Sequence, residues 1–218
     1  CRSRGAFLGL AVGVLAAAAY TPKKHRLKVY FILLIGILGV IRLTDKAFIE
    51  RILTVARPLE GSQLDSSAES RPRLWKASYE IMMGHPLGVG PGRWFDVIGN
   101  YIPEYAGKDA HSTYGRAMGE LGLPGASVFL IVIFYAFKNL RKTRQIIADL
   151  SGDDVEQFEH LIFGSKISLI VILTSGLFIT MIYTEALWLL LMLPACILKA
   201  ARSRLASQTA LSGQEDMA

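Results

Sequence analysis

The stretch LIFGSKISLIVILTSGLFITMIY, residues 161–183, decides the fold class because it is a long apolar run with a single charged residue. An α-helix rises 1.5 Å per residue and needs about 20 mostly apolar residues to cross a bilayer. The run therefore predicts a transmembrane helix. Lys166 lies near one end of the run, where we expect its side chain to snorkel toward the membrane surface.

Similar apolar runs occur elsewhere along the chain, at residues 5–20, 29–41, 122–137 and 186–198. Only Thr184 and Glu185 separate the last two runs, which predicts a tight helical hairpin. The whole sequence is 52% hydrophobic and only 19% charged, whereas about a quarter of the residues of a typical soluble domain are charged. We therefore expect an all-α, polytopic transmembrane helix bundle.

Basic residues gather beside the apolar runs, in TPKKHRLK (21–28), KNLRKTR (138–144) and KAARSR (199–204). A nucleic-acid-binding protein would concentrate such charge on a folded soluble face, so nucleic acid is excluded as a partner. Lys and Arg next to spans instead mark the cytoplasmic side. This pattern predicts two spans with a basic cytoplasmic loop in residues 1–41, three spans in residues 122–199, and a cytoplasmic tail at residues 200–218.

Residues 42–121 then form one long loop on the opposite side of the membrane, too long to be a simple connector. Apolar spacing predicts an amphipathic membrane-surface helix from Leu43 to Arg57, followed by a polar turn region at residues 58–70. A second helix is expected from Arg71 to Met83, then the loop GHPLGVGPGR, and then a helix over residues 109–121 that leads into the third span.

Three side chains outside the cytoplasm are candidates for chemistry. His111 lies where the loop re-enters the membrane, and its imidazole could act as a general base or hydrogen-bond a phosphate. The alternative interpretation is an interfacial histidine without a role. Arg71 and Arg4 carry guanidinium groups that can clamp a pyrophosphate, and the alternative for both is a solvated or snorkelling arginine. The scattered carboxylates and the two cysteines show no metal-ligand spacing, so we expect no metal and no cofactor.

Three segments carry a family resemblance: SRGAFLGL (3–10), SAESRPRLWKASYEIMMGHPLGVGPGRWF (67–95) and HSTYGRAMGELGLPG (111–125). They resemble the Ser-Arg-Gly helix entry, the Ser-x3-Arg-x3-Trp stretch with His-Pro-Leu-x-Gly-x-Gly, and the His-[Asn/Ser/Gln]-x9-Gly-x2-Gly pattern of the O-antigen ligase family. That family also includes O-antigen polymerases and protein O-oligosaccharyltransferases. The resemblance corresponds to the C-terminal half of a typical member, so we expect the chain to begin within a longer protein.

The resemblance implies an inverting, metal-independent glycosyltransferase with a GT-C-like membrane fold, a large helical periplasmic loop and a place in the bacterial inner membrane. Its donor would be a glycan on undecaprenyl pyrophosphate. Arg4 and Arg71 would bind the pyrophosphate, and His111 would activate the acceptor hydroxyl or stabilise the leaving group. Further substrate contacts would come from Arg73, Ser67, Trp75, Ser112 and Gly90.

The acceptor stays open, since lipid A-core, another glycan chain and a protein serine or threonine all fit the resemblance. The reactions would contribute to lipopolysaccharide or other surface polysaccharide biosynthesis, or to protein glycosylation. A different class of function is a non-enzymatic transporter or assembly protein. A transporter predicts ionisable residues at mid-membrane depth, whereas the predicted spans contain one charged residue, Lys166, which lies near an end of its span.

Overall fold

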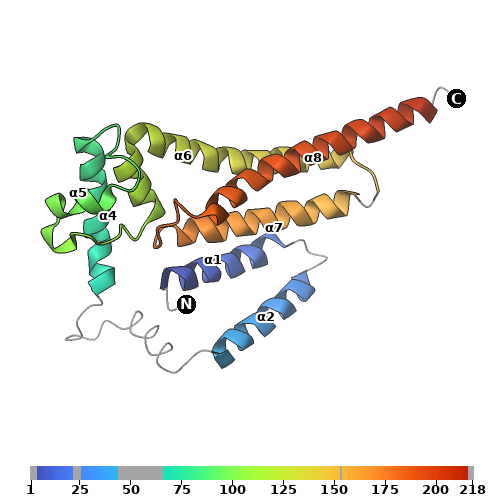
Figure 1. Ribbon diagram of the computed structural model, residues 1–218. Coiled ribbons are helices and arrows are strands. Elements are labelled where there is room, and N and C mark those ends of the chain that lie inside the picture. Colours follow the sequence, from blue (N-terminus) through green and yellow to red (C-terminus); the bar gives the residue numbers. More distant parts are fainter. Residues whose placement is uncertain (1–3, 22–25, 44–65, 153, 216–218) are drawn as a thin grey trace.

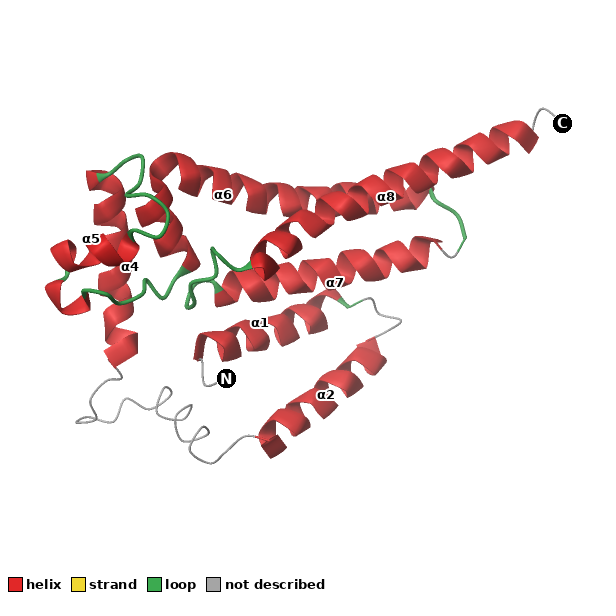
Figure 2. Cartoon of the chain, in the orientation of Figure 1, coloured by secondary structure: helices red, strands yellow, loops and turns green. Residues whose placement is uncertain are grey.

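The computed structural model describes residues 4–21, 26–43, 66–152 and 154–215, and within these ranges the chain is helical with no strand (Figures 1 and 2). The helices are α1 (Arg4–Tyr20), α2 (Arg26–Leu43), α4 (Ser66–Gly84), α5 (Trp94–Tyr101), α6 (Thr113–Ile146), α7 (Asp154–Ser175) and α8 (Glu185–Glu215), with short 3-10 turns η2 (Pro103–Tyr105) and η3 (Ile147–Asp149). The predicted all-α class is confirmed.

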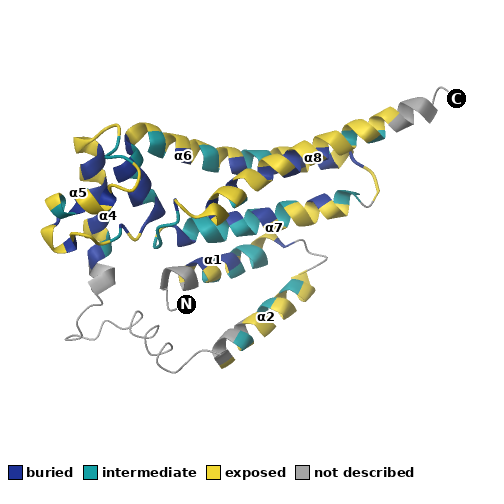
Figure 3. Ribbon diagram, viewed as in Figure 1, coloured by how far each residue is buried: buried dark blue, intermediate teal, exposed yellow. Residues whose placement is uncertain are grey.

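Three of these helical segments are long and apolar enough to cross a membrane: Thr113–Asp149, Asp154–Ser175 and Glu185–Ala210. They correspond to the third, fourth and fifth predicted spans. Leu8–Tyr20 is a shorter apolar helix, and α2 carries Arg26, Lys28 and Arg42. Large apolar side chains such as Leu189 (69% exposed) and Phe134 (61% exposed) face outward along these helices. Figure 3 shows exposed residues along α6 and α8. Such surfaces require a bilayer around them, and the chain is a multi-pass membrane protein.

The bundle is held by α6 lying along α8, and by α7 lying between this pair and α1 (Figure 1). Phe129, Leu169, Leu187 and Leu191 are almost fully buried in its core. On α1, a Cβ added at Gly9 would lie 1.9 Å from the Ser175 hydroxyl oxygen. Small residues let helices approach closely in membranes, so Gly9 sets the contact between α1 and the end of α7.

A second apolar cluster joins α4 and α5 to the first turns of α6. Leu74, Ile81, Trp94 and Ile98 form its centre, each at most 2% exposed. A Cβ at Gly119 would lie 3.1 Å from the Trp94 ring, because the indole packs directly on the α6 backbone. The predicted helix at residues 71–83 is confirmed within α4, which begins earlier, at Ser66, in the region predicted as a polar turn. The predicted amphipathic helix at residues 43–57 lies outside the described residues, apart from Leu43.

Helix α6 is broken at Gly122, whose φ of 63° and ψ of −162° are open only to glycine. The break leaves the carbonyls of Gly119 and Glu120 without helical donors, because Leu123 N donates to Pro86 O and Pro124 has no N–H. The preceding loop fills the gap with backbone bonds from Val89 N to Gly119 O (3.1 Å), Gly90 N to Glu120 O (3.0 Å) and Leu123 N to Pro86 O (2.8 Å). The predicted loop GHPLGVGPGR is therefore docked against α6.

The connection between α7 and α8 differs from the prediction. We expected a span to Tyr183 and a tight hairpin at Thr184 and Glu185, but α7 ends at Ser175 and α8 begins at Glu185. Residues 176–184 are apolar in composition yet non-helical, because their backbone groups bond to the start of α6. Thr113 N donates to Gly176 O at 2.7 Å, and the Thr113 hydroxyl donates to Ile179 O at 2.7 Å.

Replacing Gly122 with Ala should destabilise the protein by at least about 2 kcal/mol, because the backbone conformation is strained for any other residue. In addition, the new Cβ would lie 2.3 Å from both Gly88 N and Pro86 O. Gly164→Ala is the matched control, since Gly164 lies inside α7 with open space around its Cβ position. Denaturant unfolding in detergent measures both, and equal stability of the two variants would contradict the docking of the loop on α6.

Candidate functional site

The histidine singled out from the sequence lies directly before α6. His111 has a φ of 49°, the left-handed region that non-glycine residues seldom adopt and that is found disproportionately at functional sites. Its side chain is 52% exposed. The next residue, Ser112, is the N-cap of α6: its hydroxyl accepts a hydrogen bond from Gly115 N at 3.2 Å and is buried. The turn thus presents the imidazole outward while the chain enters the helix.

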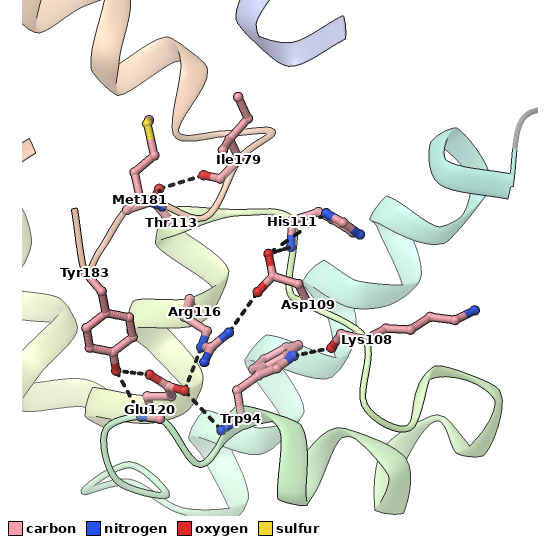
Figure 4. A network of polar contacts seen from close by, with 11 residues as sticks. Trp94, Lys108, Asp109, His111, Thr113, Arg116, Glu120, Ile179, Met181 and Tyr183 are labelled. Carbon is pink, nitrogen blue, oxygen red and sulfur yellow. Dashed lines mark hydrogen bonds and ion pairs between the residues drawn. The ribbon is translucent and has the colours of Figure 1, made fainter. Parts of the chain in front are cut away.

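Asp109 links this turn to the helix behind it. One of its carboxylate oxygens accepts the His111 backbone amide at 3.3 Å and lies 3.9 Å from His111 Nδ1. The other accepts a hydrogen bond from Arg116 Nη1 at 2.7 Å. Figure 4 shows the Arg116 side chain reaching Asp109, whereas the His111 ring points away from Arg116. The backbone at His111 is therefore held by a charge-assisted contact from α6.

Arg116 and Glu120 form an ion pair inside the protein, one helical turn apart. Arg116 Nε donates to Glu120 Oε1 at 2.6 Å, and the two side chains are only 5% and 1% exposed. The Arg116 guanidinium also lies 4.4 Å from the centroid of the Phe95 ring. The same Glu120 oxygen accepts Trp94 N at 3.0 Å, at the positive N-terminal end of α5. Glu120 consequently joins α5 to α6 through a fully buried carboxylate.

Tyr183 brings the α7–α8 connection into the same network (Figure 4). Its hydroxyl donates to the second Glu120 oxygen and accepts Gly92 N at 3.0 Å. Burial raises the pKa of Tyr183 above its ordinary value, and the hydrogen bond to Glu120 raises it further. The phenol is therefore a neutral donor at physiological pH. One carboxylate thus receives donors from α5, from α6 and from the α7–α8 connection.

The α7–α8 connection also reaches Arg71. The Arg71 guanidinium carbon lies 5.1 Å from the centroid of the Phe178 ring, a cation–π distance. Phe178 lies between Gly176 and Ile179, whose carbonyls bond to Thr113. Arg71 on α4 and Thr113, the first residue of α6, therefore contact the same short segment. Trp75, one turn after Arg71 on α4, is half-buried, as Arg71 is.

The third predicted site residue, Arg4, is the first residue of α1. Gly9, about one and a half turns further on, packs against Ser175 at the end of α7. The start of α1 therefore lies at the end of the bundle where the α7–α8 connection begins, together with α4 and the start of α6 (Figure 1). The backbone at Arg4, the Arg71 side chain and the His111 turn thus share one end of the molecule.

The other predicted substrate contacts are distributed differently. Arg73 forms an ion pair with Glu104 and stacks 5.3 Å from the Tyr105 ring centroid, so it faces the α5–η2 side rather than Phe178. Ser112 is the buried helix cap, and Gly90 donates its amide to α6. Ser67 lies in the first turn of α4. Among the described residues, no group of three His, Cys, Asp or Glu side chains is arranged to hold a metal ion.

A comparison with protein families matches residues 1–130 of the chain to the family described as O-antigen ligase. The chain belongs to the O-antigen ligase family. The matched region contains α1, α2, α4, α5 and the broken first part of α6, and it includes all three sequence motifs, at residues 3–10, 67–95 and 111–125. No curated protein and no solved structure matched the chain.

The ligase-family motifs did not reveal Arg116, Asp109, Glu120 and Tyr183 as parts of the site. The spacing of Arg116 and Glu120 was an available signal, because residues four apart share one face of a helix. Charged residues near or within a span are costly unless they pair with one another, which favours a contact between these two. Tyr183 gave no signal, since it lies in an apolar run and reaches Glu120 only through the tertiary fold.

Replacing Glu120 with Gln should lower the free energy of unfolding by about 3 kcal/mol, because it removes the charge that compensates buried Arg116. Glu80→Gln is the control: Glu80 pairs with Lys76 at 3.6 Å on the exposed surface of α4, and its loss should cost less than about 1 kcal/mol. Thermal unfolding in detergent compares the two variants. Equal and small losses would contradict the structural importance of the buried pair.

Proposed function

We propose that this membrane protein transfers a glycan from undecaprenyl pyrophosphate to an acceptor hydroxyl, in the manner of an O-antigen ligase. Membership of the family supports a glycosyltransferase-type enzyme. The residue assignment depends on one observation, that Arg71 and His111 lie at the same end of the bundle. The α7–α8 connection contacts the Arg71 guanidinium through Phe178, and it bonds to Thr113, two residues after His111. An imidazole and a guanidinium at the rim of a bilayer suit a lipid-linked diphosphate.

In the proposed reaction the acceptor oxygen attacks the anomeric carbon as the bond to the pyrophosphate oxygen breaks. Undecaprenyl pyrophosphate departs with the bonding electron pair, and the configuration at the anomeric carbon inverts. Arg71, and Arg4 from the start of α1, neutralise the charge of the leaving diphosphate by charge-assisted hydrogen bonds. Such neutralisation makes the diphosphate a good leaving group without a metal.

His111 accepts the proton of the acceptor hydroxyl, or orients the diphosphate if the acceptor loses its proton to solvent. The structure supports the first role through Asp109, whose carboxylate lies 3.9 Å from His111 Nδ1. A carboxylate at that nitrogen stabilises the imidazolium that forms when His111 takes up a proton. Catalytic hydrogen bonds are often long before substrate binds and tighten in the complex. Asp109 is therefore assigned as a positioning residue for His111.

We place the site on the periplasmic side of the inner membrane. Support comes from the charges on α6: His111 precedes its first residue, whereas Lys138, Arg141, Lys142 and Arg144 lie in its last part. Basic residues mark the cytoplasmic end of a span, so His111 lies at the other end. Among acceptors we place lipid A-core first, and a second glycan chain or a protein hydroxyl is the alternative.

Replacing His111 with Ala should lower glycan transfer at least a hundredfold while leaving membrane insertion unchanged, because a general base contributes roughly that much. The assay is transfer of labelled glycan from undecaprenyl pyrophosphate in membranes, with each of the three acceptors. His160→Ala is the control, since His160 is exposed on the first part of α7, far along the bundle from His111. Transfer by His111→Ala at the wild-type rate would refute the site.

Replacing Arg71 with Lys should lower transfer at least tenfold, because lysine keeps the charge but loses the planar fork that holds a diphosphate. Arg71→Ala should lower it further. Lys76→Ala, an exposed change on the same helix, provides the control. Donor titrations separate the effects: loss of donor binding in both Arg71 variants supports the proposal, and wild-type donor binding in Arg71→Ala contradicts it.

A further inference from the structure

A basic cavity lies between α6 and α7, away from the His111 turn. It has a volume of about 470 Å³, and its lining includes the cations Arg141, Arg144 and Lys166 and the apolar residues Phe137, Leu140 and Ile162. A smaller cavity of about 100 Å³ continues from it, sharing Arg144 and Lys166. The lining of the cavity therefore combines positively charged side chains with an apolar wall.

Residues of three helices line this cavity or its smaller extension. Arg141 and Arg144 come from the last turns of α6, and Lys166 comes from α7. The Lys166 ammonium lies 3.2 Å from the centroid of the ring of Tyr20, the last residue of α1. Lys166, which we expect to snorkel toward the membrane surface, lines this cavity. Ionisable residues inside a span are costly and mark binding sites or ion pathways.

The charges around the cavity are unbalanced. Among the described residues, Glu159 is the one acid that lines either part, against the three cations Arg141, Arg144 and Lys166. Cations brought together in a medium of low dielectric constant repel one another unless an anion lies between them. The residues that line the cavity therefore favour an anionic ligand, with Arg144 and Lys166 on opposite sides of it.

The position of the cavity indicates which anion it takes. Arg144 lies in the last turn of α6, at the end that the positive-inside rule assigns to the cytoplasm. Lys166 lies 12 residues into α7, about 18 Å along the helix from Asp154. The cavity thus extends from the membrane boundary into the apolar bundle. An anionic lipid matches this arrangement, because its phosphate lies at the membrane boundary and its acyl chains lie in the apolar interior.

We propose that this cavity binds the phosphate headgroup of an anionic membrane lipid. Arg144 and Lys166 contact the phosphate, Arg141 lies at the mouth, and an acyl chain lies against Phe137, Leu140 and Ile162. The bound lipid joins α6 to α7 and, through Tyr20, to α1. This site is separate from glycan transfer and does not depend on the proposed reaction.

The test is lipid binding to the full 218-residue chain, measured by native mass spectrometry with phosphatidylglycerol. The double variant Arg144→Gln/Lys166→Met should bind this lipid roughly thirtyfold more weakly, since each cation near a headgroup contributes to affinity. Lys142→Gln should bind within about twofold of wild type, because Lys142 lies on the same helix but is not part of the cavity lining. Arg144→Gln alone, with an intermediate loss, guards against misfolding of the double variant.

The second arm separates a lipid from a free anion. Thermal unfolding of the wild-type protein should shift upward with phosphatidylglycerol and not with inorganic phosphate at the same concentration. Equal shifts with phosphatidylglycerol and inorganic phosphate would mean that the cavity binds free phosphate rather than a lipid. That result would overturn the proposal. Equal phosphatidylglycerol affinity in wild type, Lys142→Gln and the double variant would also overturn it, because the cavity would then not be the binding site.

Discussion

The arrangement of the site depends on the break in α6 at Gly122. The break frees the carbonyls of Gly119 and Glu120, and the amides of Val89 and Gly90 satisfy them. A backbone carbonyl left unpaired near the apolar region would be costly, so the loop before α5 must stay in place. These backbone hydrogen bonds hold the loop that follows α4 against α6, and no side chain takes part in them. It explains why glycines occupy positions 88 and 122, where the two backbones meet.

The buried Glu120 carboxylate builds on that contact. Once the loop is docked, Trp94 N, Arg116 Nε and the Tyr183 hydroxyl can all donate to it. A buried charge is tolerated only when it is paired and fully hydrogen-bonded, so the network specifies one arrangement of three segments. Arg116 then holds Asp109, and Asp109 holds the backbone at His111. These hydrogen bonds therefore fix the backbone that bears the exposed imidazole. Catalysis requires such positioning of a reactive group.

Much of this architecture was predictable from the sequence. The apolar runs predicted the spans that α6, α7 and α8 form, and the three motifs led to the correct family. The end of α7 at Ser175 was not predictable from composition, because residues 176–183 are as apolar as a span. Their fold follows from hydrogen bonds to Thr113, a contact between positions far apart in the chain. The motifs also did not reveal that Ser112 caps α6 and that the Gly90 amide donates to Glu120, because both contacts arise from the local backbone geometry.

We propose that Arg71 and the turn at His111 bind one diphosphate at the end of the bundle where α7 meets α8. A cryo-electron microscopy structure with a non-transferable undecaprenyl pyrophosphate glycan tests it most directly. We expect density for the diphosphate between the Arg71 guanidinium and the His111 imidazole, with the lipid chain extending into the bilayer. Density for the diphosphate in the cavity of Arg141, Arg144 and Lys166, with Arg71 and His111 contacting no part of the donor, would contradict it.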